Sequence, residues 1–211
     1  MSAIPYQSGY SPQRYQSSLN TMLKKKQNAI AADQLRTILL LEADFNHLNK
    51  KLGRDLMYQA EQLKMIAPEQ FGSRKYHSCI DQVLIKRLYY DSLRFLKQNA
   101  FLCSNDAKAC YDRITHSIAS LAMQRVGMPL GPIKCLLKSL QEMKHYVKTA
   151  HGISKHSYGC LLHDEKPVQG SGQGNGASPT IWTLISSPLL SMMRTLGFGA
   201  DFKSPLSNES I

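Results

Sequence analysis

The stretch "QGSGQGNGASP", residues Gln169 to Pro179, decides the fold because it holds four glycines and no apolar side chain larger than alanine before its final Ser-Pro. Glycine has no Cβ, so backbone this bare can lie against another segment or a ligand where other residues would collide. Ser178 suits the N-cap of a helix, and Pro179 suits its first position. The following apolar residues predict that helix, with a kink or restart at Pro188 and an end at Gly197.

Upstream of this loop, the apolar spacing alternates between short strands and long helices. Strands are predicted over residues 38–41, 100–103, 147–153 and 158–163. Helices are predicted where apolar residues recur at helical spacing, over residues 45–63, 80–95, 114–122 and 133–146. Asp112 is interpreted as the N-cap of the third of these helices. No internal repeat is visible, so the pattern predicts a sheet covered by helices.

The chain is strongly basic. Twenty-six Lys and Arg residues stand against fifteen Asp and Glu residues, which gives a formal net charge of +11 in 211 residues and a pI near 9.5. A charge of this size favours a polyanionic partner, nucleic acid above all, although a basic soluble protein without such a partner stays open. The polar, aperiodic residues through Ser18 are predicted to form a disordered tail.

Cysteine usage and hydropathy point to an intracellular protein. Five cysteines are an odd number, and their spacing does not match a zinc site, so reduced and mostly buried thiols are predicted. No apolar run is long enough to span a bilayer, so no membrane partner is predicted. We expect a nuclear or cytoplasmic location, and the acid-free first 32 residues leave an organelle transit peptide open.

Three interpretations of the glycine stretch compete. Gly172, Gly174 and Ala177 fit a dinucleotide-binding fingerprint, but the preceding "LLHDEKPVQG" is charged and unlike a central parallel strand. A plain linker does not explain the helix that starts directly after it. In the third interpretation, "QGNGASP", residues 173–179, resembles the Q-G-x-x-x-S-P block of reverse transcriptases.

Three further blocks in the same order strengthen this resemblance. "CSNDAKACYDRITHS" is similar to the block that carries the first catalytic aspartate, and "LRTILLLEADFNHLNKKLGRDLM" resembles the finger segment with its long helix. "EQFGSRK" resembles the stretch before the next helix. The closest likeness is to reverse transcriptase domains of the non-LTR retroelement type.

The resemblance implies an α+β fold, a partial right-hand polymerase in which long helices pack on a small, mainly antiparallel sheet. It divides the chain into a polar and basic N-terminal segment (1–34), a fingers-like region (35–99) and an incomplete palm-like region (100–211). It also implies an RNA template, a DNA primer and deoxynucleotide triphosphates as partners, with two Mg²⁺ ions as cofactor.

The family's site residues transfer onto matching positions. Asp106 would be a catalytic, metal-binding carboxylate, whereas Asp112 lies too far along an extended chain to share the ions. Gln173 and Gly174 would bind the nucleotide. Tyr111 would exclude nucleotides that carry a 2′-hydroxyl. Arg36 would bind the triphosphate, assisted by one of Lys24 to Lys26. Ser178 and Pro179 would contact the template and primer.

Each assignment has a simpler alternative. Asp106 could cap a surface turn, Tyr111 could be a core aromatic, and the lysine run could be a solvated tail. Thr37 stands where the family normally has proline, which weakens the assignment of Arg36. No Asp-Asp pair occurs in the sequence, although the family's catalytic hairpin carries one, so the chain is expected to be catalytically incomplete by itself. A non-enzymatic nucleic-acid binder therefore remains an alternative.

Overall fold

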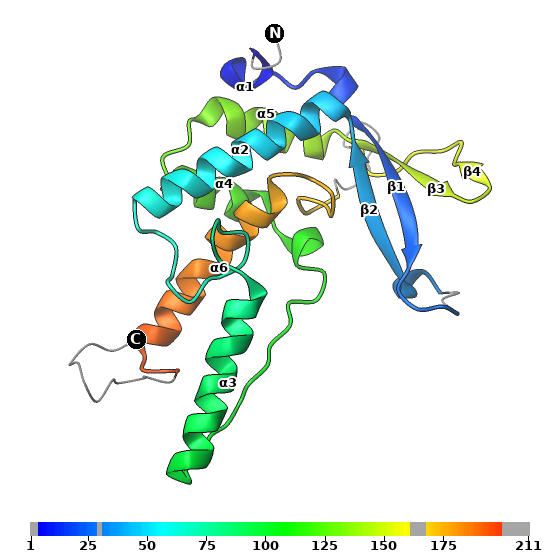
Figure 1. The fold of residues 1–211 in the computed structure, drawn as a ribbon. Coiled ribbons are helices and arrows are strands. Elements are labelled where there is room, and N and C mark those ends of the chain that lie inside the picture. Colours follow the sequence, from blue (N-terminus) through cyan, green and yellow to red (C-terminus); the bar gives the residue numbers. More distant parts are fainter. Residues whose placement is uncertain (1–3, 29–30, 161–167, 200–211) are drawn as a thin grey trace.

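A hairpin near the N-terminus forms half of the sheet. β1 (Ser17–Lys24) pairs antiparallel with β2 (Leu35–Leu41) and in parallel with β3 (Lys144–Thr149), which turns back into β4 (Gly152–Ile153). The strand order is β2-β1-β3-β4 (Figure 1). This computed structural model, which describes residues 4–28, 31–160 and 168–199, confirms the predicted α+β fold with a small, mainly antiparallel sheet.

Helices make up most of the remaining chain, and all four predicted upstream segments contain one. The helices are α1 (Ile4–Ser8), α2 (Ala43–Gln62), α3 (Cys79–Leu96), α4 (His116–Arg125), α5 (Leu130–Gln141) and α6 (Ser178–Thr195). Three short 3-10 turns accompany them: η1 (Gln13–Tyr15), η2 (Ala32–Gln34) and η3 (Cys110–Arg113). α6 is one continuous helix through Pro188, so of the predicted kink or restart the restart does not occur, and Gly197 follows the helix with a φ of +74°.

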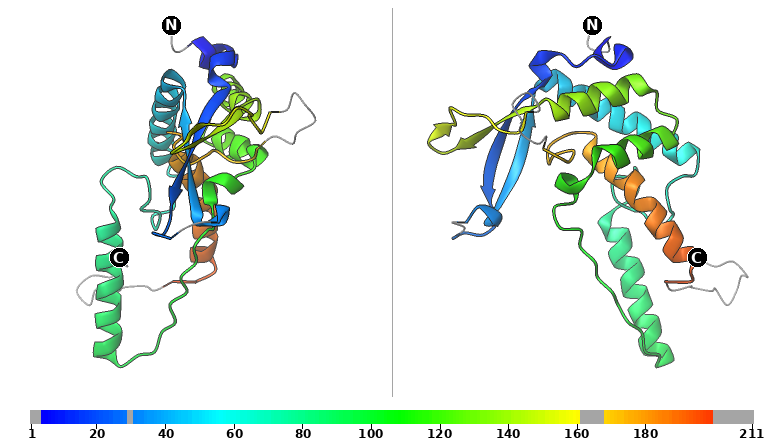
Figure 2. Two further views of the ribbon diagram at one scale, coloured as in Figure 1. Left: turned by 90° about the vertical axis from the view of Figure 1, so that its right-hand side faces the viewer. Right: turned by 180° about the vertical axis from the view of Figure 1, so that it is seen from behind.

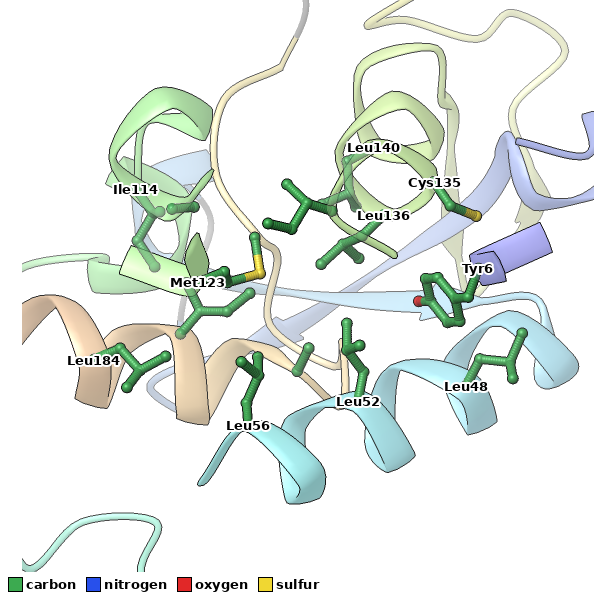
Figure 3. Packing of buried hydrophobic residues seen from close by; sticks show 14 of the residues in the cluster. Tyr6, Leu48, Leu52, Leu56, Ile114, Met123, Cys135, Leu136, Leu140 and Leu184 are labelled. Carbon is green, nitrogen blue, oxygen red and sulfur yellow. The ribbon is translucent and has the colours of Figure 1, made fainter. Parts of the chain in front are cut away.

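The core lies between α2, α4, α5 and α6. On α2, Leu48, Leu52 and Leu56 recur every four residues, so they share one face of the helix and are buried. Figure 3 shows these side chains directed toward Met123 of α4 and Leu136 of α5. Burying this apolar stripe supplies the main driving force for the packing of the helical body.

The N-terminal residues are folded, so the predicted disordered tail is wrong for residues 4–18. Tyr6 is buried and its hydroxyl donates a hydrogen bond to Asn49 Oδ1 on α2, and the ring of Tyr15 stacks on Phe45 with centroids 4.9 Å apart. The composition of this segment is polar, but its tyrosines combine a large apolar surface with a polar end that finds a partner.

α3 is confirmed as a helix, but it buries none of its residues. A capping box between Ser78 and Asp81 begins it, and Lys97, in the left-handed region, ends it. Most of its apolar side chains, among them Ile80, Leu84 and Phe95, are exposed, and Figures 1 and 2 show it projecting away from the helical body. The strand predicted over residues 100–103 is absent: this segment is irregular, and Phe101 is fully exposed.

Smaller predictions also require correction. Tyr146 lies in β3 rather than in the preceding helix, because α5 ends at Gln141. The cysteines are free, as predicted, but only Cys135 and Cys160 are buried. No helix among the described residues is long and apolar enough to cross a bilayer.

Candidate functional site

The glycine loop, residues 168–177, is bonded to the turn that follows Asp106. The N–H of Ser171 donates to the carbonyl of Tyr111 over 2.8 Å, and His116 Nε2 donates to the carbonyl of Gly170 over 2.9 Å. A Cβ on Gly170 would lie 2.5 Å from the same Tyr111 oxygen. Two blocks that are almost sixty residues apart in sequence are therefore in direct backbone contact.

The same loop lies against the hairpin. The N–H of Leu39 on β2 donates to the carbonyl of Gln173 over 2.6 Å. Cβ atoms placed on Gly172 and Gly174 would lie 2.4 Å from Leu39 Cδ2 and 2.2 Å from the Leu39 carbonyl oxygen. At Gly174 the collision would be with backbone, so only glycine permits this approach, whereas at Gly172 the Leu39 side chain could move and the φ of +76° is what favours glycine.

A third set of contacts joins the loop to α2. The amide of Asn46 donates to the carbonyl of Gly174 over 3.1 Å and its oxygen accepts from the N–H of Gly176 over 2.9 Å. A Cβ on Gly176 would lie 2.9 Å from backbone atoms of Lys50. The bare backbone thus contacts protein on three sides, which accounts for the glycines without a ligand.

Ser178 is not the N-cap of α6, contrary to the sequence prediction. Ala177 precedes the helix, and the Ser178 hydroxyl donates to the carbonyls of Ser171 and Gly172, each over 3.0 Å. The Asn175 side chain accepts from the N–H of Ala177. Because the buried Ser178 hydroxyl bonds to these two carbonyls, it holds the loop in a closed turn at the start of α6.

A pocket opens between the glycine loop and the sheet. This loop pocket has a volume of about 290 Å³. Its polar lining comprises Asn20 and Thr37 of the hairpin, Asp112 of η3, His145 and Tyr158 of the β3 region, and Gln169, Ser171 and Gln173 of the loop. Leu39, Leu140 and Val168 are the apolar side chains of its lining.

Burial shifts the pKa of two groups in the loop pocket. It lowers the pKa of His145 to about 4, so this imidazole is neutral at pH 7. It also raises the pKa of the Asp112 carboxyl. Asp112 lies in η3 and does not cap α4, because the N-cap position of that helix is Thr115.

The predicted site residues are only partly brought together. Gln173 lines the loop pocket, and Tyr111 contacts the loop through its carbonyl while its half-buried ring packs against the core. Asp106 is exposed in the irregular segment, five residues before Tyr111. The first-aspartate block therefore touches the loop at Tyr111, Asp112 and His116, and not at Asp106.

Arg36 lies on the other face of the hairpin. Side chains alternate along a strand, so Arg36 on β2 points away from the face on which Thr37 and Leu39 line the pocket. It is exposed. Of the lysine run, Lys25 Nζ donates to the carbonyl of Asp33 across the end of the hairpin, over 2.9 Å.

Comparison with known proteins decides the family. Residues 23–199 match the family model described as "Reverse transcriptase (RNA-dependent DNA polymerase)". The chain belongs to the reverse transcriptase family. It is 23% identical over 192 residues to the "Retrovirus-related Pol polyprotein from type-1 retrotransposable element R2" of Popillia japonica, which supports the predicted non-LTR retroelement type. That match covers 90% of this chain and 26% of the relative, so the chain spans about a quarter of that protein's length.

Reverse transcriptases generally use divalent metal ions, and the described residues do not fit such a site. Within residues 4–28, 31–160 and 168–199, no three His, Cys, Asp or Glu side chains gather as metal ligands. Asp106 offers one carboxylate, whereas Mg²⁺ needs octahedral oxygen coordination. Asp201, the acidic residue that follows α6, lies outside the described residues.

A second feature of this reverse transcriptase domain was not predicted from the sequence: a groove between α2, residues 73–75 and the start of α6. We name it the α2 groove; its lining includes His47, Lys50, Arg54, Tyr58, Lys75, Gly176 and Thr180. The acidic residue of the lining, Glu61, is paired with Arg74, Oε1 to Nε 3.0 Å. Lys50 and Arg54 are four residues apart, and this helical spacing was a signal that the sequence offered.

Proposed function

We propose that this chain forms the nucleotide-facing part of an RNA-directed DNA polymerase that extends a DNA primer on an RNA template with deoxynucleotides. The glycine loop carries this proposal, because it contacts two of the blocks that resemble the family: the finger segment, at β2 and α2, and the first-aspartate block, at the Tyr111–Asp112 turn. In this proposal Gln173 and Gly174 bind the nucleotide, and Asp106 contributes a metal-binding carboxylate.

The other assignments receive unequal support. The contact of the Tyr111 carbonyl with the loop supports a place for Tyr111 beside the nucleotide sugar. Ser178 and Pro179 are proposed to act on the template and primer indirectly, because the Ser178 hydroxyl is occupied by loop carbonyls. Arg36 would reach a triphosphate only on the face of β2 that lies away from the loop pocket.

We further propose that the chain is catalytically incomplete by itself. Nucleotidyl transfer by this family requires several carboxylates around its metal ions, and Asp106 has no such neighbours among the residues that the structure describes. The further ligands for two Mg²⁺ ions would come from a segment that carries an Asp-Asp pair. No catalytic step is assigned to the described residues alone.

Primer extension tests this proposal. A labelled DNA primer annealed to an RNA template is incubated with the chain alone and with the chain extended downstream by a segment that contains an Asp-Asp hairpin. We expect extension only by the longer protein, and its loss in Asp106→Asn. Asp55→Asn is the matched control, because Asp55 is likewise exposed but lies on α2. Absence of extension by the longer protein, or full activity of Asp106→Asn, would reject the proposal.

A non-enzymatic nucleic-acid binder is the second candidate, and the α2 groove favours it. Three basic side chains, Lys50, Arg54 and Lys75, line this groove beside Gly176. Each cation that contacts a phosphate releases about one counterion, so affinity depends steeply on salt.

The two candidates differ in their response to substitution. For a pure binder, Arg54→Ala and Lys50→Ala reduce the slope of log affinity against log salt by about one each. Asp106→Ala and Gln173→Ala leave the RNA affinity of a binder that uses the α2 groove alone unchanged. A polymerase, in contrast, loses nucleotide incorporation in both of the latter variants.

A further inference from the structure

A neutral polar cluster is buried beside the glycine loop, and the reverse transcriptase assignment does not account for it. Ser18 and Asn20 lie on the same face of β1, and Ser18 pairs in register with His145 of β3. Ser18 Oγ lies 2.9 Å from His145 Nδ1, and the Asn20 amide donates to the Tyr158 hydroxyl. All three of Ser18, Asn20 and His145 are buried.

An aromatic surface covers this cluster at the loop pocket. The rings of His145 and Tyr158 are stacked, with centroids 5.3 Å apart and an interplanar angle of 28°. Tyr158 is 40% exposed, so part of its surface remains accessible to a ligand. Asn20, His145 and Tyr158 all contribute to the pocket lining.

The lining of the loop pocket selects an uncharged ligand. The described residues of the lining include no lysine or arginine, so none of them offers a cation to a triphosphate. Two primary amides, Gln169 and Gln173, and the Asp112 carboxyl offer hydrogen bonds, while Leu39 and Leu140 are apolar. Burial lowers the pKa of His145 to about 4, so its imidazole is uncharged at pH 7 as well.

Size restricts the ligand further. The volume of about 290 Å³ lies just below the roughly 300–1,000 Å³ of small-molecule pockets, so the ligand must be small. Proteins recognise unstacked bases by aromatic stacking together with hydrogen bonds to the base edges. A flat heteroaromatic ring with several hydrogen-bonding edges matches a pocket that offers an aromatic ring together with side-chain amides.

We propose that the loop pocket binds one unstacked nucleobase, which stacks on Tyr158 and forms hydrogen bonds with the amides of Gln169 and Gln173. The choice of a nucleobase rests on the proposed nucleic-acid function. The base is supplied either by a single-stranded RNA or by a free nucleotide, and the experiment separates these sources.

Binding of short RNA tests the proposal. The affinity of a labelled single-stranded octanucleotide is measured for the wild type, Tyr158→Leu, Tyr158→Phe and Tyr10→Leu across a salt series. Loss of the stacking ring in Tyr158→Leu weakens binding roughly tenfold without changing the salt slope. Tyr158→Phe keeps the ring and stays within about threefold of the wild type, and the exposed Tyr10 serves as a control outside the pocket.

Nuclear magnetic resonance of the labelled wild type provides a second measurement that does not depend on the folding of any variant. Side-chain signals of Asn20, Gln173 and Tyr158 are followed during titration with the four nucleosides and with the same RNA. Shifts with nucleosides and RNA identify a pocket for any base, and shifts with RNA alone identify a strand site.

The two proposals fail in different ways. If neither ligand shifts these signals, the pocket proposal is overturned, even where RNA binds elsewhere and primer extension succeeds. If nucleosides shift the signals but the longer protein does not extend primers, the polymerase proposal fails and the pocket stands.

Discussion

An alanine substitution at Gly174 tests whether contacts inside the protein are the reason for glycine in this loop. Gly174 and Gly152 have φ angles of +117° and +127°, so alanine is strained to a similar degree at both positions. Only their surroundings differ: a Cβ at Gly174 would lie 2.2 Å from the Leu39 carbonyl oxygen, whereas a Cβ at Gly152 meets nothing within 4 Å. The pair of alanine variants therefore separates the contact from the conformation.

The expected magnitudes follow from these two contributions. Backbone strain costs each variant about 1–3 kcal/mol of unfolding free energy. At Gly174 the collision adds about 1–3 kcal/mol, and weakening of the 2.6 Å hydrogen bond from Leu39 to Gln173 adds about 1 kcal/mol. We expect Gly174→Ala to be less stable than Gly152→Ala by about 2–4 kcal/mol, a large part of the 5–15 kcal/mol typical of a domain.

Urea denaturation measures this difference. With a slope of about 2 kcal/mol per molar urea, the midpoint of Gly174→Ala lies about 1–2 M below that of Gly152→Ala. Equal midpoints for the two variants would refute the reasoning. A Gly174→Ala variant that keeps its stability but loses RNA affinity would show that this glycine serves a ligand instead of the packing.

Two further variants test the N-terminal segment and the buried histidine. Tyr6→Phe removes the hydrogen bond to the fully buried Asn49 and lowers the unfolding free energy by about 1–3 kcal/mol, whereas Tyr10→Phe, at an exposed tyrosine, changes it little. A tail that contributes nothing to the fold would make the two variants equal. Because burial lowers the pKa of His145 to about 4 and an unfolded histidine titrates near 6.5, acid favours unfolding between these values. The wild type therefore loses about 3 kcal/mol more than His145→Gln between pH 6.5 and 4, in thermal or urea unfolding at each pH, and parallel profiles would contradict the neutral state of His145.

Elements with a local sequence signal were predictable. The spacing of Leu48, Leu52 and Leu56 fixes the buried face of α2, and the strand predicted at residues 38–41 is the second half of β2. The order of four short blocks was also sufficient to identify the family, because each block combines turn chemistry with a neighbouring apolar run. These signals depend only on residues that are close in the chain.

Features that depend on distant partners were not predictable. The apolar residues at 100–103 have the composition of a strand, yet no strand pairs with them among the described residues, and Phe101 is exposed. Conversely, β1 has little periodic signal, but it lies between β2 and β3 and is held from both sides. A strand forms where its hydrogen bonds are satisfied, which composition alone does not determine.

The glycines of the loop make contacts inside the chain that the sequence interpretation did not predict. The sequence interpretation placed the glycines against a nucleotide, but Gly170, Gly172, Gly174 and Gly176 each lie against other parts of the same chain. Through these contacts the loop connects the hairpin, α2 and the Tyr111–Asp112 turn. Any ligand in the loop pocket would therefore meet side chains such as Gln173, which these contacts hold in place. Substitutions of the loop glycines would then change the affinity for the ligand even where the glycine does not touch it.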